Sequence, residues 1–480
     1  METPILGSTY VTRSVNAANA TMINLYPEVI PEGGKEPAFL TRCPGLKYWQ
    51  SVGEGPIRQV YTTQSYSSRL YVASGNEFYL LGSLSDDPIK LGDISGNGPV
   101  SIADNGTQFF IACGDQGFIY NQSTNVFSQI TDPDFPGATT VTYLDGYFVF
   151  NEPSSQRVWT SVLLDGTSVD PLDFASAEGS PDGVVAILAD HRELVVFGTD
   201  TTEVWYNAAL PDFPLAPIQG AFNEIGCISA WSIAKLDNSI FWLGTSPRGK
   251  GIVYRANGYT AIRVSTHAVE WQIQQYERIT DAVGYSYQQE GHLFYVLNFP
   301  SANRTWVYDA ATNSWHERAS FIEGELSRHR SNCHCNFQGN TVVGDYSNGN
   351  IYTFDTNIYD DYGGVQKVVR SWRAFYPGMN DLRRTAQHSL QLDVETGVGL
   401  TEGQGSDPQV VLRWSDDGGH SWSNEHWRSL GPIGEYGRRV IWRRLGMTNK
   451  IRDRVYEISI TDPVKVNIMG AQLLLSTTDA

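Results

Sequence analysis

The chain has 480 residues, of which 41% are hydrophobic and 12% aromatic, so it can bury a sizeable core and does not read as a disordered chain. Its formal net charge is −18, and an acidic body of this size disfavours non-specific binding of nucleic acid. The five cysteines are odd in number and scattered, which favours reduced thiols over a disulfide framework. The sequence contains no run of 18 apolar residues, so it predicts no membrane-spanning segment.

The first 50 residues differ from the rest of the chain. They do not begin with the basic stretch and apolar run of a secretory signal. The segment Asn24–Glu28, the turn Glu32–Lys35 and the segment Pro44–Leu46 contain few runs typical of strands. We therefore expect residues 1–50 to form an extended N-terminal arm that packs across a neighbouring surface, in the same chain or in another.

Residues 51–365 repeat a strand–turn–strand phrase about every 38 to 53 residues. Each phrase joins a run of alternating β-branched and aromatic residues to a second strand through a short turn with Gly, Asn or Asp. The phrases begin near Leu70, Phe109, Tyr147, Leu194, Ile240, Leu293 and Thr341. Repeats of this size must stack on their neighbours to bury their apolar faces. For units of several short strands this predicts an all-β fold, a β-propeller of six or seven blades.

Two blade endings, Ile119–Phe127 and Val307–Trp315, resemble the kelch pattern. In both, a strand ends in Tyr followed by Asn121 or Asp309, and an aromatic residue opens the next strand after a turn. We expect the Asn or Asp side chain to cap the turn.

Residues 366–480 break the period. Alternating strands near 389–394, 409–414, 455–460 and 464–468, with turns such as Asp416–Gly419, predict an antiparallel, β-sandwich-like C-terminal module. These strands could also complete the propeller. The segment holds 15 Lys/Arg and 13 Asp/Glu, which gives it a net charge of +2. Because the whole chain carries −18, residues 1–365 carry −20.

One cluster of metal-ligand residue types stands out. Cys333, His334 and Cys335 lie close to His329, but no second Cys/His pair follows at zinc-site spacing. We interpret them as buried cysteines beside a surface histidine, and we expect neither a metal nor another cofactor. Phosphate-binding, dinucleotide and hydrolase motifs are also missing from the sequence, and we expect a protein that is not an enzyme.

A second motif leaves an alternative open. Ser415, Asp417, Gly419 and Trp422 fit the Asp-box pattern of sialidase propellers. In that pattern Asp and Ser tie a tight hairpin and carry no catalysis. The motif occurs once and outside the repeats, so a propeller glycosidase or glycan-binding module is the alternative function.

The strongest local charge signal is basic. Arg438, Arg439, Arg443 and Arg444 flank Trp442, and arginine with tryptophan is the composition of an interface anchor. Three interpretations compete: a docking patch for an acidic partner or for the acidic body of a neighbouring copy, a solvated edge strand protected by charge, and a nucleic-acid contact. The first is favoured, and it makes these five residues the candidate partner interface.

Three stretches together resemble a known family. They are Asn24–Glu28 with Pro44–Leu46, then Phe174–Val184 leading to Leu194–Gly198 and Thr202–Trp205, and finally Arg438–Gly446 with Val464. They occur in order over nearly the full length. On this basis the chain resembles the packaged-DNA stabilisation proteins, also called tail hub or nozzle proteins, of short-tailed phages.

The resemblance implies a structural virion protein of the phage tail, assembled in the host cytoplasm as a hexameric ring around the tail axis. It would extend the DNA channel below the portal and its adaptor, retain the packaged DNA, and provide attachment for the tail needle and for a tailspike or fibre. Genomic DNA would pass without specific binding, and no membrane would be involved. An acidic wall would suit this role, because basic walls bind phosphates and stall the passage of DNA.

Overall fold

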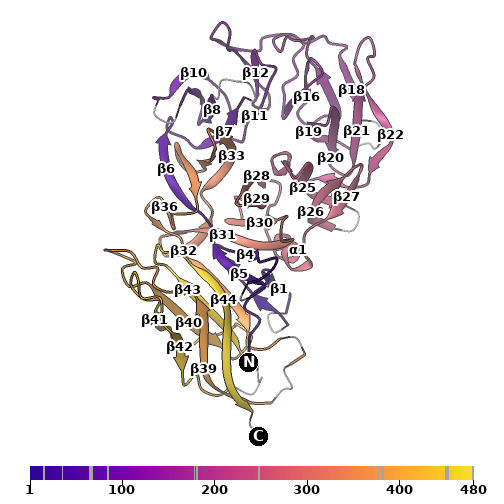
Figure 1. Ribbon diagram of the computed structural model, residues 1–480. Helices are drawn as coiled ribbons and strands as arrows, with labels where there is room; N and C mark the ends of the chain where they lie inside the picture. Colours follow the sequence, from indigo (N-terminus) through magenta and orange to yellow (C-terminus); the bar gives the residue numbers. More distant parts are fainter. Residues whose placement is uncertain are drawn as a thin grey trace.

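The computed structural model describes the chain except residues 15, 16, 35, 64–68, 84, 85, 178, 180, 181, 247, 248, 377, 380–382, 449–452 and 478–480. Within the described residues the elements are strands apart from the helix α1 (His267–Gln274) and the short 3-10 helix η1 (Ala230–Ser232). Figure 1 shows a ring of small sheets in the upper part and a separate β module below it. The predicted all-β class, a propeller with a C-terminal antiparallel module, is confirmed.

Seven blades, each built around a four-stranded sheet, form the ring. The first blade contains β7 (Ile57–Thr62), β8 (Leu70–Ser74), β9 (Glu77–Leu81) and β10 (Ile89–Asp93); the second contains β11 (Ser101–Asp104), β12 (Gln108–Ala112), β13 (Gly117–Asn121) and β14 (Val126–Gln129); the third contains β15 (Val141–Leu144), β16 (Tyr147–Asn151), β17 (Arg157–Thr160) and β18 (Phe174–Ser176). The fourth contains β19 (Val184–Asp190), β20 (Glu193–Gly198), β21 (Thr202–Asn207) and β22 (Leu215–Asn223); the fifth contains β23 (Gly226–Cys227), β25 (Ser239–Ser246), β26 (Gly249–Asn257) and β27 (Thr260–Arg263), with β24 (Ala234–Leu236) beside β25. The sixth contains β28 (Val283–Gln289), β29 (His292–Phe299), β30 (Arg304–Asp309) and β31 (Ser314–Ile322), with β32 (Glu325–Arg328) beside β31; the seventh contains β33 (Ser331–Phe337), β34 (Asn340–Asp345), β35 (Asn350–Asp355) and β6 (Gly45–Ser51). Each of the seven phrases found in the sequence starts in the second strand of a blade.

Aromatic side chains fill the space between blades, as stacked repeats require. Between the second and third blades, for example, the ring of Phe110 lies 5.6 Å from that of Phe148 and 5.5 Å from that of Phe150, measured between centroids. The blade-ending turns are capped as predicted. The side chain of Asn121 accepts the backbone N–H of Ser123, and that of Asp309 accepts the backbone N–H of Ala311, both at 3.0 Å.

The ring is closed by the N-terminal segment. Strand β6 is the fourth strand of the seventh blade, where Leu46 pairs with Phe354 of β35, and β7 follows it directly as the first strand of the first blade. The C-terminal strands therefore do not complete the propeller. The sequence placed residues 45–50, most of β6, at the end of an extended arm because the partner strand lies about 300 residues away, beyond the reach of any local pattern.

The C-terminal module also takes strands from the N-terminal segment. One of its sheets has the order β4 (Leu25–Val29), β5 (Ala38–Arg42), β44 (Asn467–Thr477), β39 (Thr385–Val394) and β42 (Val440–Arg443). The other contains β38 (Val368–Arg373), β43 (Val455–Ile460), β40 (Gln409–Ser415) and β41 (His426–Ser429), and β3 (Met22–Ile23) joins it to β31 of the sixth blade. The remaining strands are β1 (Tyr10–Val11) and β2 (Asn19–Ala20), which pair with each other, and β36 (Asp360–Asp361) and β37 (Gly364–Val365), which follow β6.

Buried arginines hold the N-terminal segment to the module. The guanidinium of Arg42 donates to the carbonyls of Asp462 and Val464 at 2.7 and 2.8 Å, and that of Arg370 donates to the carbonyl of Ile5 at 2.7 Å. The segment thus packs across its own chain and contains six short strands, more than the sequence indicated. The division into an arm (1–50), a propeller (51–365) and a module (366–480) stays a proposal, since β6 belongs to the propeller sheet and β3, β4 and β5 to the sheets of the module.

Candidate functional site: the propeller cavity and the basic edge of the module

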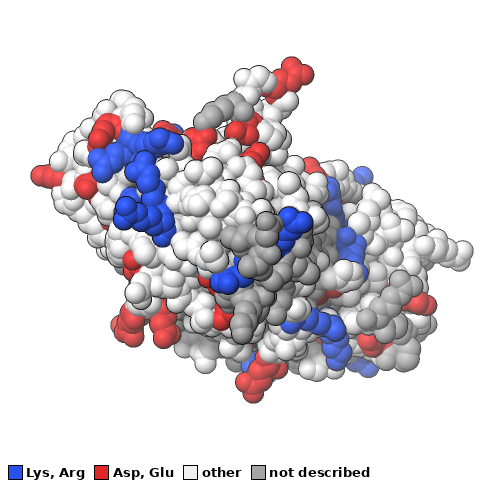
Figure 2. Space-filling view, turned by 90° about the horizontal axis from the view of Figure 1, so that it is seen from below, with Lys and Arg blue, Asp and Glu red and all other residues white. Residues whose placement is uncertain are grey.

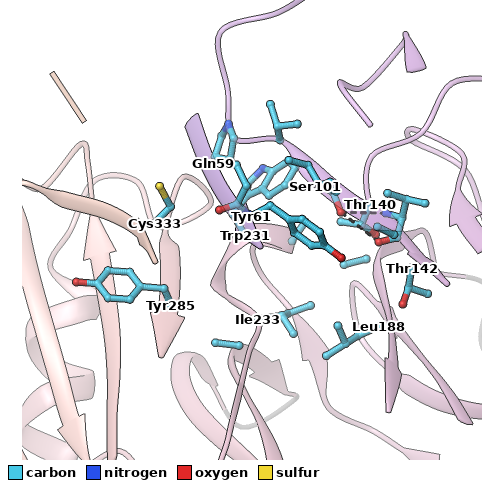
Figure 3. Close-up of a pocket in the computed structure, with 18 of the residues that line it drawn as sticks. Gln59, Tyr61, Ser101, Thr140, Thr142, Leu188, Trp231, Ile233, Tyr285 and Cys333 are labelled. Carbon is cyan, nitrogen blue, oxygen red and sulfur yellow. Dashed lines mark hydrogen bonds between the residues drawn. The ribbon is translucent and has the colours of Figure 1, made fainter. Parts of the chain in front are cut away.

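The inner strands of the blades surround a cavity of about 710 Å³. Figure 3 shows the rings of Tyr61 and Trp231 near the middle of the view, between Tyr285 on one side and Thr142 on the other. Tyr61 comes from β7, Tyr285 from β28 and Trp231 from η1, and Tyr143 of β15 also lines the cavity, so four blades contribute aromatic side chains. A cavity at this position is where a propeller would hold a ligand, and its lining groups decide what it can do.

The hydroxyl groups of the lining hold the blades together. The Ser101 hydroxyl accepts the backbone N–H of Val141 at 3.0 Å, which joins the second blade to the third. The Thr140 hydroxyl accepts the backbone N–H of Ile187 at 2.9 Å, which joins the third blade to the fourth. Dashed lines in Figure 3 mark hydrogen bonds of this group. These hydroxyls therefore link neighbouring blades of the ring.

The charged groups of the lining are also paired. The buried guanidinium of Arg58 donates to the carbonyls of Ser95 and Gly75 at 2.9 and 3.0 Å. The Tyr61 hydroxyl donates to a carboxylate oxygen of Asp104 at 2.6 Å, and burial raises the pKa of Tyr61. Among the described lining residues, no Ser or Cys is hydrogen-bonded to a His or to a carboxylate. The described part of the lining therefore shows no serine or cysteine nucleophile paired with a base.

The Cys–x–Cys strand is structural. Cys333 and Cys335 are buried on β33, and burial raises the pKa of the Cys333 thiol to about 12. His334 is half-buried against the cavity, and burial lowers its pKa to about 4, so the expectation of a surface histidine was wrong. In the part of the chain that the structure describes, no three His, Cys, Asp or Glu side chains are grouped as metal ligands would be.

The Asp-box residues form a tight turn, as the sequence predicted. The Asp417 carboxylate accepts the backbone N–H groups of His420 and Ser421, both at 2.9 Å, and the Ser415 hydroxyl donates to it at 2.6 Å. These bonds, with the Ser415 hydroxyl first, hold the pKa of Asp417 well below its usual range. The carboxylate is fully engaged by the turn and is not available as a catalytic acid.

The predicted basic interface is partly wrong. Arg438, Arg439, Arg443 and Arg444 are exposed, but Trp442 is only 1% exposed and lies in the core of the module. Its indole N–H donates to the carbonyl of His426 at 2.8 Å. Because side chains alternate along β42, Trp442 points inward, and it cannot anchor a partner.

The exposed arginines lie on or beside an edge strand. Among the described residues, β42 pairs with β39 on one side, and its other side faces β41 of the opposite sheet. Arg428 of β41 reaches across this edge and donates to the carbonyl of Ile441 at 2.9 Å. Figure 2, which views the molecule from below, shows Lys and Arg side chains gathered in one group at the left, the side on which Figure 1 places β41 and β42.

The comparisons with known proteins decide the family. The sequence profile described as "Bacteriophage P22 Gp10, beta-propeller" matches residues 1–359, and the profile described as "Bacteriophage P22 Gp10, beta-sandwich" matches residues 372–475. The chain belongs to the bacteriophage P22 Gp10 family. The resemblance to tail hub proteins inferred from the sequence is thereby confirmed.

The match to the Gp10 family extends over both domains. A curated relative, "Tail hub protein gp10" of Salmonella phage P22, is 20% identical over 413 residues, which cover 82% of this chain and 84% of that protein. Solved structures that match the chain include the N-terminal domain of Nup159 (10% identity, 68% of this chain and 98% of that chain, TM-score 0.40). Another is the extracellular domain of the putative one component system BT4673 from B. thetaiotaomicron (10% identity, 86% and 58%, TM-score 0.43).

Membership of the Gp10 family does not favour the glycosidase alternative, in agreement with the turn role of Asp417. Two of the stretches that carried the resemblance are now placed in the fold: Asn24–Glu28 includes most of β4, and Arg438–Gly446 includes β42. Within Phe174–Val184, residues 178, 180 and 181 lie outside the described residues. Within the described residues, no helix has the length and apolar character that crossing a bilayer requires.

Sequence reasoning missed two exposed aromatic residues near the arginines. Trp427 is 52% exposed on β41, and Tyr436 is 76% exposed in the loop that leads to β42. A signal was present for Tyr436, because it lies between Gly434 and Gly437, in a glycine-rich turn where an aromatic side chain has few neighbours to pack against.

Proposed function

We propose that this chain is a structural tail hub protein of a phage virion, without enzymatic activity, and that several copies form a ring around the tail axis. The observation that carries the proposal is the collinear match of both the propeller and the sandwich to the Gp10 family, whose curated member from phage P22 is named a tail hub protein. The resemblance drawn from the sequence gives the ring six copies.

The genome would pass through the axis of the ring. The copies would surround this path together, so that no single propeller would have to conduct the DNA. Residues 1–365 carry a net charge of −20 and residues 366–480 carry +2, and a negative wall would repel phosphates and avoid gripping the DNA as it moves.

The ring would hold the packaged DNA below the portal and its adaptor and would carry the tail needle and a tailspike or fibre. The architecture supports such a mechanical role. Strand β6 closes the propeller with seven residues from the N-terminal segment, and β3 makes one sheet of the sixth blade and the module. A closed ring of sheets has few free edges from which unfolding under load can start.

Particle assembly without the protein tests this function. Phage that carry a nonsense codon in this gene should fill their heads with DNA and then lose it, because the hub that retains the DNA is missing. The measurement is nuclease-protected DNA per particle after purification, and addition of the purified protein to freshly made particles should restore retention. Normal retention in particles without the protein, or absence of the protein from wild-type particles, would contradict the proposal.

A further inference from the structure

One edge of the C-terminal module combines exposed arginines with exposed aromatic rings. We define this basic edge as Trp427 and Arg428 of β41, Tyr436, Arg438 and Arg439 of the loop before β42, and Arg443 and Arg444 at its end. Arg438 pairs with Glu435 at 3.1 Å. Arg428 donates only to backbone carbonyls and Arg439 to the Gln391 amide. In the part of the chain that the structure describes, no carboxylate forms an ion pair with Arg428, Arg439, Arg443 or Arg444.

The composition of this edge is that of a protein interface. Tryptophan, tyrosine and arginine are the residues most enriched in binding hot spots, and lysine is depleted at interfaces. The simpler explanation is an edge strand protected from aggregation by its charges. That explanation accounts for the arginines, but it does not account for Trp427 and Tyr436, which expose 52% and 76% of their surface beside them.

The propeller of the same chain carries a patch of opposite character on its third and fourth blades. Leu172 and Leu210 are 70% and 50% exposed there, next to Asp170, Asp173 and Asp212. The three carboxylates are close enough to affect one another, since partial burial and then Asp170 and Asp212 raise the pKa of Asp173. Among the described residues no Lys or Arg forms an ion pair with them. We define these five residues as the acidic patch.

We propose that the basic edge of one copy docks on the acidic patch of a second copy. The edge offers arginines and exposed aromatic rings, and the patch offers carboxylates and exposed leucines, so both the charges and the apolar groups are complementary. The two surfaces belong to different domains, so the contact is heterologous, and a heterologous contact generates a ring when its rotation closes. This inference rests on the proposed function, in which copies of the chain form a ring, and it names the surfaces that join them.

Charge exchange between the two surfaces tests the contact. The variants are Arg439→Glu with Arg443→Glu on the edge, Asp170→Lys with Asp212→Lys on the patch, and all four substitutions in one chain. A matched control, Lys250→Glu with Arg278→Glu, changes the net charge as much as the edge variant does, at exposed positions of the propeller. The readout is sedimentation velocity over a range of protein concentrations, at about 10 mM and about 1 M salt, where the Debye length is about 30 Å and about 3 Å.

The unmodified chain should self-associate at low salt, and high salt should weaken the association. Each two-residue variant should lower the association constant by at least about tenfold, while the control stays within about threefold of the unmodified chain. The four-residue variant should recover most of the loss, because its glutamates then meet lysines. Thermal unfolding midpoints within about 3 °C of the unmodified chain would show that the variants are folded.

Three results would overturn the contact. They are an unmodified chain that stays monomeric at every concentration, an edge variant that associates like the unmodified chain, and a four-residue variant that does not recover. Tight binding of duplex DNA by the unmodified chain at about 0.15 M salt, lost in the edge variant, would assign the edge to nucleic acid instead. If the association of the variants does not change as predicted while the unmodified chain restores DNA retention in particles, the contact is wrong and the proposed function stands.

Discussion

Trp442 and Tyr436 should respond in opposite ways to substitution, although both lie near the arginines in sequence. The Trp442 side chain is buried in the core of the module. An aromatic side chain buries about 150–250 Å², which at about 25 cal/mol per Å² corresponds to roughly 4–6 kcal/mol. Alanine retains a small part of this, and the indole hydrogen bond to the His426 carbonyl contributes about 1 kcal/mol more. Trp442→Ala should therefore destabilise the module by about 3–5 kcal/mol.

Tyr436→Ala should change the free energy of unfolding by less than about 0.5 kcal/mol, because the ring is exposed. The assay is urea unfolding of the full chain by circular dichroism and tryptophan fluorescence, analysed for the transition of the module, since two domains need not unfold together. Tyr436→Ala should instead weaken self-association in the folded protein. A stable Trp442→Ala variant together with an unfolded Tyr436→Ala variant would refute the assignment of core and surface made here.

Three further predictions concern stability. Gly45→Ala should weaken closure of the ring by about 1–3 kcal/mol, because its Cβ would lie 2.5 Å from the carbonyl oxygen of Asp360, whereas Gly98→Ala, with no neighbour within 4 Å, should be silent in the same thermal scan. Burial raises the pKa of Asp361 to about 7, above its value in the unfolded chain, so its ionisation destabilises the fold as the pH rises from about 4 to about 7. Asp361→Asn should accordingly gain stability relative to the unmodified chain across that range by an amount on the order of 4 kcal/mol at most, and a difference that is flat with pH would contradict this. Asp417→Ala should destabilise the module by about 1–2 kcal/mol above pH 4, with a smaller effect in acid, because the depressed pKa of this carboxyl makes its contribution vanish as the pH falls; an equal effect at pH 2 and pH 7 in urea titrations would show that the turn does not depend on the charge.

The repeat could be found in the sequence because each blade has a local pattern of strands and turns. Phe109 and Leu293 start hairpins whose strands are neighbours in both sequence and space, and Asp309 caps the turn that follows its own strand. Period and turn chemistry are local signals, so they predicted the propeller and the position of the second strand of each blade. They left six or seven blades open because one hairpin could have belonged to an insertion.

Closure of the ring and the inward-facing side of β42 could not be predicted in this way. Leu46 pairs with Phe354, and no local pattern reports a partner so far away in the chain. On β42, the buried residues Val440 and Trp442 alternate with Ile441 and Arg443, and the pairing of Leu390 with Trp442 turns the indole inward. Only the pairing with β39 decides which side of the strand meets the core.

Imaging of the tail of the purified phage tests the central claim most directly. Electron cryomicroscopy of intact particles should show copies of the propeller with its attached sandwich in a closed ring around the tail axis, with the DNA path between the copies and the small propeller cavities away from it. Absence of this density from the tail, or DNA running through a single propeller, would contradict the account.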